Sequence, residues 1–391
     1  MEFKKVGVVG GGIMGAGIIQ VLLNAGVEVD FKELDQDLVE QTLGKVEKIF
    51  RSAKLKGLIS ENVIRRNMAS VRGFTNCDPF RDVSLVIEAV PERLEIKREV
   101  FEELDRICGP EAILASNTSS LSISQLCGFT QRPERVIGMH WFNPVHIMKL
   151  VEIVPGLETS QKTIDALFQL CIRLDKVPIG VKECAGFLVN RLLGIYVNEA
   201  LFMVEEGQAP QAVDQAAEDM GIPMGPIMLG DMVGWDTIYR ANMTLYQEYG
   251  SRFGMPSLLA EVYEAGRWGA KAGEGFYKYE GGRVVHEKGY LVEHQEQLSS
   301  RLLSVMINEG IRCLDENVAS IEDIDTAMKV GAGMPKGPLK WADEIGLDQL
   351  LNQLEELRGS YGERFLPSPL LKTKVAARHL GKKKGSGFYR Y

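Results

Sequence analysis

Two polar residues in the middle of the chain could together take a proton from a substrate. His140 follows the apolar run Val136–Met139, and Glu152 lies in the next strand-like segment, Lys149–Val154. A neutral imidazole accepts a proton near neutral pH, and a neighbouring carboxylate fixes its tautomer and stabilises the resulting cation. On spacing alone, a structural histidine and a solvated glutamate remain open. The pair indicates general base catalysis, for example in alcohol oxidation, if other motifs support it.

A glycine-rich segment near the N-terminus could bind the pyrophosphate of a dinucleotide. Gly10-x-Gly12-x-x-Gly15 lies between the strand-like run Val6–Val9 and a stretch with helical periodicity. Without side chains the backbone can turn tightly, and a pyrophosphate can approach the amides of the helix N-terminus. The alternative is a glycine turn without a ligand. The strand, turn and helix around the motif predict a dinucleotide site.

Glu33 bears on which dinucleotide is bound. It ends the second predicted strand, Val27–Lys32, close to the distance of about 20 residues at which a ribose-binding carboxylate follows the glycine motif. A carboxylate there binds the ribose hydroxyls of the adenosine and repels the additional phosphate of NADP. Lys32, Asp35 and Asp37 nearby weaken this argument. We predict NAD rather than NADP as the cofactor.

The elements that must position these residues alternate between short strands and helices. Arg93–Ile107 is rich in Glu, Lys and Leu and predicts a helix between two strands. The further strand-like runs are Ser84–Val90, Ala112–Ala115, Val136–Met139, Lys149–Val154 and Val177–Val181. This order predicts an α/β Rossmann-type fold with a doubly wound parallel sheet.

The second half of the chain is mainly helical and contains an internal repeat. Segments of its first part recur further along at a nearly constant offset: Arg191-Leu-Leu as Arg301-Leu-Leu, Gly225-Pro226 as Gly337-Pro338, and Lys271-Ala-Gly-Glu-Gly-Phe-Tyr277 as Lys383-Lys-Gly-Ser-Gly-Phe-Tyr389. Such a regular offset indicates one duplicated all-α domain. We predict an NAD-binding domain over 1–182, a first helical domain over 183–280, a connector over 281–295, and a second helical copy over 296–391.

Composition excludes several classes of function. The chain has 391 residues and a formal charge of −8, which has the wrong sign for non-specific binding of nucleic acid. Its six cysteines form no CxxC pair, so we expect neither a metal site nor a disulfide framework. No apolar run is long enough to span a membrane. We expect a cytoplasmic protein with no nucleic-acid or membrane partner.

Four further motifs make the chain recognisable. In order they are Asn117-Thr-Ser119-Ser120-Leu121, His140-Trp-Phe-Asn143-Pro144, Lys149-Leu-Val-Glu152 and Gly186-Phe-Leu-Val-Asn190-Arg191. They closely resemble the successive motifs of the L-3-hydroxyacyl-CoA dehydrogenase family. The resemblance runs from Lys5 to Tyr279 and recurs in the second helical copy through Tyr391.

The resemblance implies a role for each matching position. His140 would be the base and Glu152 its carboxylate partner. Ser119 and Asn190 would donate hydrogen bonds to the reacting oxygen, which positioned hydroxyl and amide groups can stabilise as its charge changes. The implied cofactor contacts include four more side chains and Ser119 itself: Asn143 at the nicotinamide, Glu92, Lys97 and Lys271.

Two of the implied assignments have structural alternatives. Lys56 matches a family contact to the phosphates of coenzyme A and ends the basic cluster Arg51-Ser-Ala-Lys54-Leu-Lys56. Ile49 stands where some members have a serine contact, and a charge run of this kind is usually a solvated helix face. Ser119, with Ser120 beside it before Leu121, also suits the N-cap of a helix.

The resemblance implies reversible, NAD-dependent oxidation of an L-3-hydroxyacyl-CoA of short chain, such as 3-hydroxybutyryl-CoA. This activity belongs to fatty-acid β-oxidation or butanoate metabolism, and we expect the dehydrogenase step alone. Two alternatives remain: a related sugar-acid dehydrogenase acting on L-gulonate, and a catalytically idle NAD-binding structural protein. In the second copy Ser300 replaces Asn190, so we expect no second active site. The second copy would instead replace a dimer partner, in a monomer or a homodimer.

Overall fold

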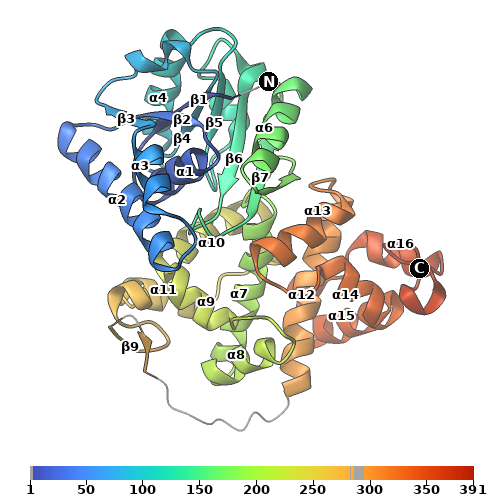
Figure 1. Cartoon of the computed structure of the whole chain (residues 1–391). Coiled ribbons are helices and arrows are strands. Elements are labelled where there is room, and N and C mark those ends of the chain that lie inside the picture. The colour runs from blue at the N-terminus through green and yellow to red at the C-terminus, as the bar shows by residue number, and fades with distance from the viewer. Residues whose placement is uncertain (1–2, 282, 286–294) are drawn as a thin grey trace. The chain divides into compact units, whose positions relative to one another are not determined.

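The computed structural model describes residues 3–281, 283–285 and 295–391. The chain divides into two compact units, Met1–Glu183 and Cys184–Tyr391. The N-terminal unit runs from blue to green in Figure 1, and the C-terminal unit from green to red.

The N-terminal unit is built on one eight-stranded sheet. Across the sheet the strands are β3 (Val71–Phe74), β2 (Glu28–Lys32), β1 (Lys5–Val9), β4 (Leu85–Glu88), β5 (Ile113–Ser116), β6 (Val136–Trp141), β7 (Leu150–Pro155) and β8 (Val177–Gly180). The strand order reverses between β1 and β4, as in doubly wound sheets that bind dinucleotides. The predicted Rossmann-type fold is confirmed, with β3 as a strand that the sequence pattern did not indicate.

The sheet departs from a fully parallel arrangement at one place. β6 pairs with β7 in the antiparallel sense, whereas every other neighbouring pair is parallel. The connection between β6 and β7 is only residues 142–149, and a parallel crossover needs a dozen residues or more. The expectation that Lys149–Val154 extends the sheet in parallel is therefore wrong, because the chain turns back directly after His140.

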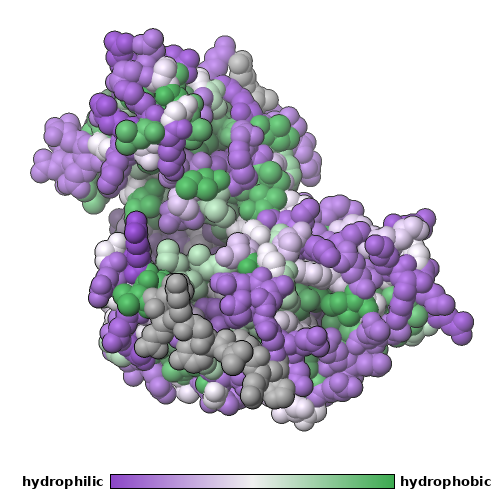
Figure 2. Space-filling model, turned by 60° about the horizontal axis from the view of Figure 1, so that its bottom comes forward, coloured by the Kyte–Doolittle hydropathy of each residue, from purple (hydrophilic) through white to green (hydrophobic). Residues whose placement is uncertain are grey.

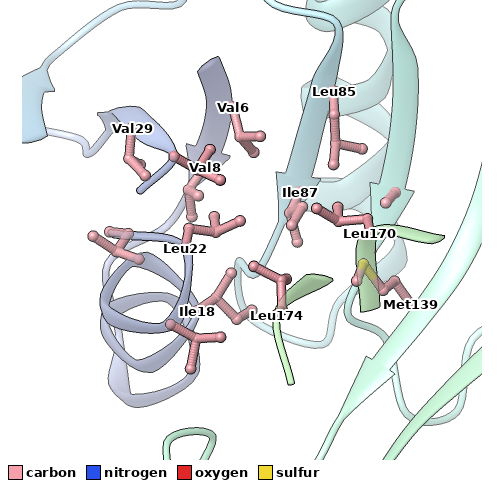
Figure 3. Close-up of a cluster of buried hydrophobic side chains, with 14 of the residues drawn as sticks. Val6, Val8, Ile18, Leu22, Val29, Leu85, Ile87, Met139, Leu170 and Leu174 are labelled. Carbon is pink, nitrogen blue, oxygen red and sulfur yellow. The ribbon is translucent and has the colours of Figure 1, made fainter. Parts of the chain in front are cut away.

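Helices cover both faces of the sheet. They are α1 (Ile13–Asn24), α2 (Gln36–Leu55), α3 (Glu61–Met68), α4 (Leu94–Ile107), α5 (Ile123–Cys127) and α6 (Gln161–Arg173). One buried cluster takes every second residue of the strands, which is the period expected for one sheet face. Figure 3 shows part of it, where side chains of β1, β4 and α1 gather: Val6, Val8, Leu85, Ile87, Ile18 and Leu22. The alternate residues Val86, Leu114 and Val136 are also fully buried, so the opposite face is covered too.

The C-terminal unit consists of two similar sets of helices. The first set is α7 (Val189–Glu205), α8 (Pro210–Glu218), α9 (Pro226–Val233), α10 (Trp235–Tyr249) and α11 (Ser257–Glu264). The second is α12 (Gln295–Asp315), α13 (Ile321–Thr326), α14 (Pro338–Ile345), α15 (Leu347–Tyr361) and α16 (Pro369–Ala376). A small hairpin of β9 (Tyr279–Glu280) and β10 (Arg283–Val284) follows the first set. Most of the predicted connector over 281–295 lies outside the described residues.

An equivalent buried aspartate binds the C-terminal segment of each helical copy. Asp231 of α9 accepts hydrogen bonds from the amides of Phe276 and Tyr277 at 3.0 and 2.9 Å. In the second copy, Asp343 of α14 accepts from the amides of Phe388 and Tyr389 at 2.8 Å each. The repeated Gly-Phe-Tyr segment therefore has a structural role, because its amides bind the last segment of each copy to the buried aspartate.

An arginine of each helical copy contacts a glutamate of the other copy. Arg191 of the first copy donates from Nε to Glu309 of the second at 2.7 Å, and Arg301 of the second donates from Nε to Glu199 of the first at 2.5 Å. Arg191 and Arg301 occupy matching positions of the repeat, as do Glu199 and Glu309, so the two contacts are equivalent under exchange of the copies. Such reciprocity is the mark of a two-fold related interface. Figure 1 shows α7 and α12, which carry these residues, within this unit.

The visible surface is largely hydrophilic, with hydrophobic residues in separate patches (Figure 2). Within the described ranges, no helix has the length and apolar character needed to cross a bilayer. Nor do the described His, Cys, Asp and Glu side chains form a group of three or more that could hold a metal ion. All six cysteines are free thiols, five of them buried.

Candidate active site

The candidate residues of the N-terminal unit gather at one edge of its sheet. Gly10 follows β1, Glu33 follows β2, Glu92 follows β4, Ser119 follows β5, and His140 lies near the end of β6. These five strands run in the same direction, so their carboxyl ends share one edge. Ligands of open α/β sheets bind at this edge, beside the point where the strand order reverses.

The antiparallel β6–β7 pair brings His140 and Glu152 together. The two residues are directly opposite in register, so their side chains lie on the same face of the sheet. His140 Nδ1 lies 2.6 Å from Glu152 Oε2, and the two side chains are 7% and 0% exposed. A carboxylate at Nδ1 holds the imidazole in the tautomer whose Nε2 accepts a proton. The buried contact thus provides the geometry required for a general base.

The glycine turn between β1 and α1 has the geometry of a pyrophosphate cradle. Gly10 adopts a φ of +91°, and a Cβ on Gly15 would lie 1.8 Å from the carbonyl oxygen of Gly10. Gly12, at the N-cap of α1, would meet nothing within 4 Å, so the space above the helix N-terminus is open. These features fit a dinucleotide, whose phosphates need both close backbone approach and open space.

Two side chains of α2, which the sequence pattern did not indicate, support this turn. Thr42 Oγ1 and Lys45 Nζ each donate to the carbonyl of Gly11 at 3.1 Å. Glu33 accepts from the amide of Gly11 through Oε1, so the predicted ribose ligand is already oriented by the turn. The available signal was the spacing of Thr42 and Lys45, which lie one turn apart on the same helix face.

Glu92 organises the loop that carries Ser119. One carboxylate oxygen, Oε1, accepts from Thr118 Oγ1 at 2.6 Å and from the amides of Ser119 and Ser120 at 2.9 and 3.1 Å. Burial raises the pKa of Glu92, but Lys97 and these donors outweigh it, so the pKa lies below its usual value. The N-cap of the following helix is Ser122, which accepts from the amide of Gln125. The alternative that Ser119 is a helix N-cap is therefore wrong.

Lys97 is enclosed by carboxylates rather than open to the site. Its side chain is 1% exposed, and Nζ lies 2.7 and 2.9 Å from the two oxygens of the fully buried Glu88. Glu92 Oε2 lies 3.2 Å from the same nitrogen, and Ser116 Oγ donates to Glu88 at 2.5 Å. The cofactor contact implied for Lys97 remains a prediction. The contacts of Lys97 favour an indirect role, in which it orients Glu92 and through it the loop of Ser119.

Asn143 and Lys56 lie on exposed segments of the same unit. Asn143 follows β6 in the connection to β7. Lys56 is the C-cap of α2, with Leu55 and Leu58 beside it 90% and 72% exposed. Arg51 and Lys54 of the basic cluster pair with Glu47 and Glu61. Within the described chain Lys56 has no ion-pair partner, which leaves its ammonium available to a phosphate.

Asn190 and Lys271 belong to the C-terminal unit. Asn190 is the second residue of α7, directly after the segment where Gly186 and Phe187 adopt positive φ angles of +71° and +50°. Lys271 is 45% exposed and pairs with Asp236. Their predicted contacts to substrate and cofactor remain predictions.

The doubly wound sheet, its glycine turn and the His140–Glu152 pair at one edge define the class of NAD-binding dehydrogenases. The N-terminal part, residues 5–184, matches the family model of the 3-hydroxyacyl-CoA dehydrogenase NAD-binding domain. Residues 186–279 and 298–391 each match the model of the 3-hydroxyacyl-CoA dehydrogenase C-terminal domain. The chain belongs to the 3-hydroxyacyl-CoA dehydrogenase family.

Relatives include subunits of fatty acid oxidation complexes and solved 3-hydroxybutyryl-CoA dehydrogenases. A fatty acid oxidation complex subunit alpha of Vibrio campbellii is 36% identical over 386 residues, covering 95% of this chain and 55% of that protein. The chain thus spans about half the length of the curated relatives it matches. A solved 3-hydroxybutyryl-CoA dehydrogenase from Escherichia coli has a TM-score of 0.90 and 28% identity, covering 96% of this chain and 99% of that one. A solved (S)-3-hydroxybutyryl-CoA dehydrogenase from Ralstonia eutropha has a TM-score of 0.70 and 36% identity, covering 71% and 100%.

Proposed function

We propose that this protein catalyses the reversible, NAD-dependent oxidation of an L-3-hydroxyacyl-CoA to the 3-oxoacyl-CoA. The observation that carries the proposal is the buried contact of His140 with Glu152 at the edge of an NAD-binding sheet. The names of two solved relatives support a short substrate, 3-hydroxybutyryl-CoA. The name of the Vibrio relative supports a place in fatty-acid oxidation.

His140 carries out the proton transfer in this proposal. NAD, when bound, supplies the acceptor for the hydride that leaves C3 of the substrate. His140 takes the proton of the 3-hydroxyl, and Glu152 stabilises the imidazolium that forms. In the reverse direction the same imidazolium returns the proton to the 3-oxo group. Ser119 and Asn190 are proposed as donors to the reacting oxygen, Lys56 as a contact to coenzyme A, and Lys271 as a contact to NAD.

An absorbance assay of NADH tests the proposal. Purified protein is incubated with NAD and either 3-hydroxybutyryl-CoA, longer 3-hydroxyacyl-CoA substrates or L-gulonate. We expect NADH with the acyl-CoA substrates and none with L-gulonate. Formation of NADH from L-gulonate alone would favour the sugar-acid alternative. If the protein binds NAD but forms NADH with none of these substrates, the alternative of a catalytically idle NAD-binding protein is favoured.

We further propose that the second helical copy takes the place of a dimer partner. The reciprocal contacts of Arg191 with Glu309 and of Arg301 with Glu199 support it, because they relate the copies as two subunits of a homodimer would be related. Light scattering after size exclusion should give the mass of a monomer. A well-folded and fully active monomer that lacks residues 296–391 would contradict this role.

Six free thiols also support a reducing compartment such as the cytoplasm.

A further inference from the structure

Two turns of the N-terminal unit are joined by lysines that cross in opposite directions. One turn, residues 142–149, links β6 to β7, and the other, residues 174–176, links α6 to β8. Lys149 of the first donates to the carbonyl of Asp175 in the second at 3.2 Å. Lys176 of the second donates to the carbonyls of Val145 and Met148 in the first at 2.5 and 2.6 Å. The turn that follows His140 is therefore tied to the turn that leads into β8.

The two lysines differ in their surroundings. The side chain of Lys149 is 51% exposed, whereas Lys176 is 7% exposed as a residue and its Nζ lies 5.8 Å from the centroid of the Trp141 ring. Burial, and then the charge of Lys149, lower the pKa of Lys176 to about 8, although Asp175 acts in the opposite sense. An ammonium withdrawn from water is costly unless its donors are used, and here two short bonds to carbonyls use them. Lys176 thus has a defined task inside the fold.

The opposite side of the same turn is packed against the dinucleotide-binding helix. Val145 is 2% exposed, and a Cβ on Gly17 of α1 would lie 2.8 Å from the Cβ of Val145. A side chain at position 17 would therefore displace the turn. The turn lies between α1, which starts at the glycine cradle, and the ammonium of Lys176.

Asn143 depends on this turn for its position. Among the described residues, no side-chain hydrogen bond holds Asn143 itself, so its backbone must place it. Before it, the amide of Trp141 donates to Asn117 Oδ1 at 3.0 Å. After it, the carbonyl of Pro144 accepts from the amides of Ile147 and Met148 at 2.9 Å each and closes the turn.

We propose that Lys176 is a positioning residue for the dehydrogenase reaction, because its buried ammonium holds the 144–148 turn and through it Asn143. The inference rests on the proposed function, in which Asn143 places the nicotinamide beside His140. Loss of the ammonium frees two carbonyls, so the turn keeps its packing against Gly17 but loses the contact that holds its other side. Lys176 acts through the turn and touches no reacting atom.

The test compares Lys176→Met with Lys149→Met, which removes the exposed lysine that crosses the same two turns. Hydrogen exchange followed by mass spectrometry measures the amides of residues 145–148, since Pro144 has none. In Lys176→Met we expect their exchange to accelerate by roughly tenfold or more, as expected for a local opening that has lost its holding contact. In Lys149→Met we expect a change of at most about twofold, because exposed charge contacts contribute little.

Steady-state kinetics tests the effect on the reaction. Lys176→Met should lower kcat by roughly 10- to 100-fold, the size of effect that a misplacement of about 1 Å can produce, while KM for the acyl-CoA stays within about threefold. Combined with Asn143→Ala, it should add no further loss, since both changes remove the same placement. Lys176→Gln, which keeps a donor without the charge, serves if the methionine variant does not fold.

Two results would overturn the inference: unchanged exchange of the amides of residues 145–148 in Lys176→Met, or kcat losses that multiply in the double variant with Asn143→Ala. Failure of the proposed function is separate, since it would show as no NADH formation in the unaltered protein. In that case the exchange comparison still decides whether Lys176 holds the turn.

Discussion

Removal of Arg191 should destabilise the C-terminal unit strongly, because it breaks a buried contact between the two helical copies. The side chains of Arg191 and Glu309 are both 0% exposed. In Arg191→Met the carboxylate of Glu309 keeps, among the described residues, one ion-pair partner, Arg252 at 3.1 Å. Loss of one partner of a buried ion pair costs about 3–5 kcal/mol, because the remaining charge is left without its main partner in a place that water does not reach.

The structure also sets the size of the thermal shift. The C-terminal unit runs from Cys184 to Tyr391. For a unit of about 200 residues each kcal/mol shifts Tm by about 2–4 °C, so we expect a decrease on the order of 10 °C. Three of the four tryptophans, Trp235, Trp268 and Trp341, lie in this unit, so tryptophan fluorescence during heating or urea unfolding reports mainly on it.

Two comparisons make the experiment decisive. Arg301→Met removes the symmetry-related contact to Glu199 and should cost a similar amount. Arg358→Met removes a pair with Glu363 whose side chains are 36% and 61% exposed, and should lower stability far less, because solvent screens exposed charge pairs. If Arg191→Met lowers stability no more than Arg358→Met, the reasoning about the interface between the copies is refuted.

Three further predictions concern the N-terminal unit. His140→Gln should lower kcat by about 10²–10⁴-fold with nearly unchanged NAD affinity in calorimetry, and unfolding instead would favour a structural histidine. Gly15→Ala should weaken NAD binding by roughly tenfold or more because its Cβ would overlap the Gly10 carbonyl, whereas Gly44→Ala, which meets nothing within 4 Å, should not. Burial and Lys149 lower the pKa of Lys176 to about 8. An unfolded lysine titrates near pH 10.4, so the unfolded chain binds more protons between these values, and stability should rise with pH there by on the order of 1–3 kcal/mol. Urea unfolding from pH 7.5 to 9.5 measures this slope, and an equal slope in Lys176→Met would count against the assignment.

Local patterns were sufficient to predict the Rossmann-type sheet. Short apolar runs, most of them separated by helical stretches, predicted seven of its eight strands, and the glycine motif lies between β1 and α1 as expected. The missed strand, β3, has the sequence Val-Arg-Gly-Phe, and only its first residue is fully buried. A four-residue edge strand with this composition carries little periodicity, so only pairing with β2 identifies it.

The contacts that orient the site could not be predicted, because they join residues distant in sequence. Glu92 and Ser119 are 27 positions apart, and Lys176 reaches Val145 across 31. The direct opposition of His140 and Glu152 depends on β7 running antiparallel to β6, which follows from the length of the turn between them. Residue type and spacing therefore indicated the chemistry, while strand direction and register decide which side chains meet.

The duplicated helical domain allows structural and functional demands to be separated within one chain. The pair of Lys271 with Asp236 recurs in the second copy as Lys383 with Asp348, at 2.6 Å. The second copy directly follows the first helical copy and not an NAD-binding domain, so a lysine that served the cofactor alone would have no reason to recur there. Lys271 therefore contributes to the fold of the helical domain whether or not it also contacts NAD. Asn190 shows the opposite pattern, since Ser300 occupies the equivalent position on α12 and the helix still forms and packs. The amide of Asn190 is thus not required by helix packing, which supports its proposed role towards the substrate.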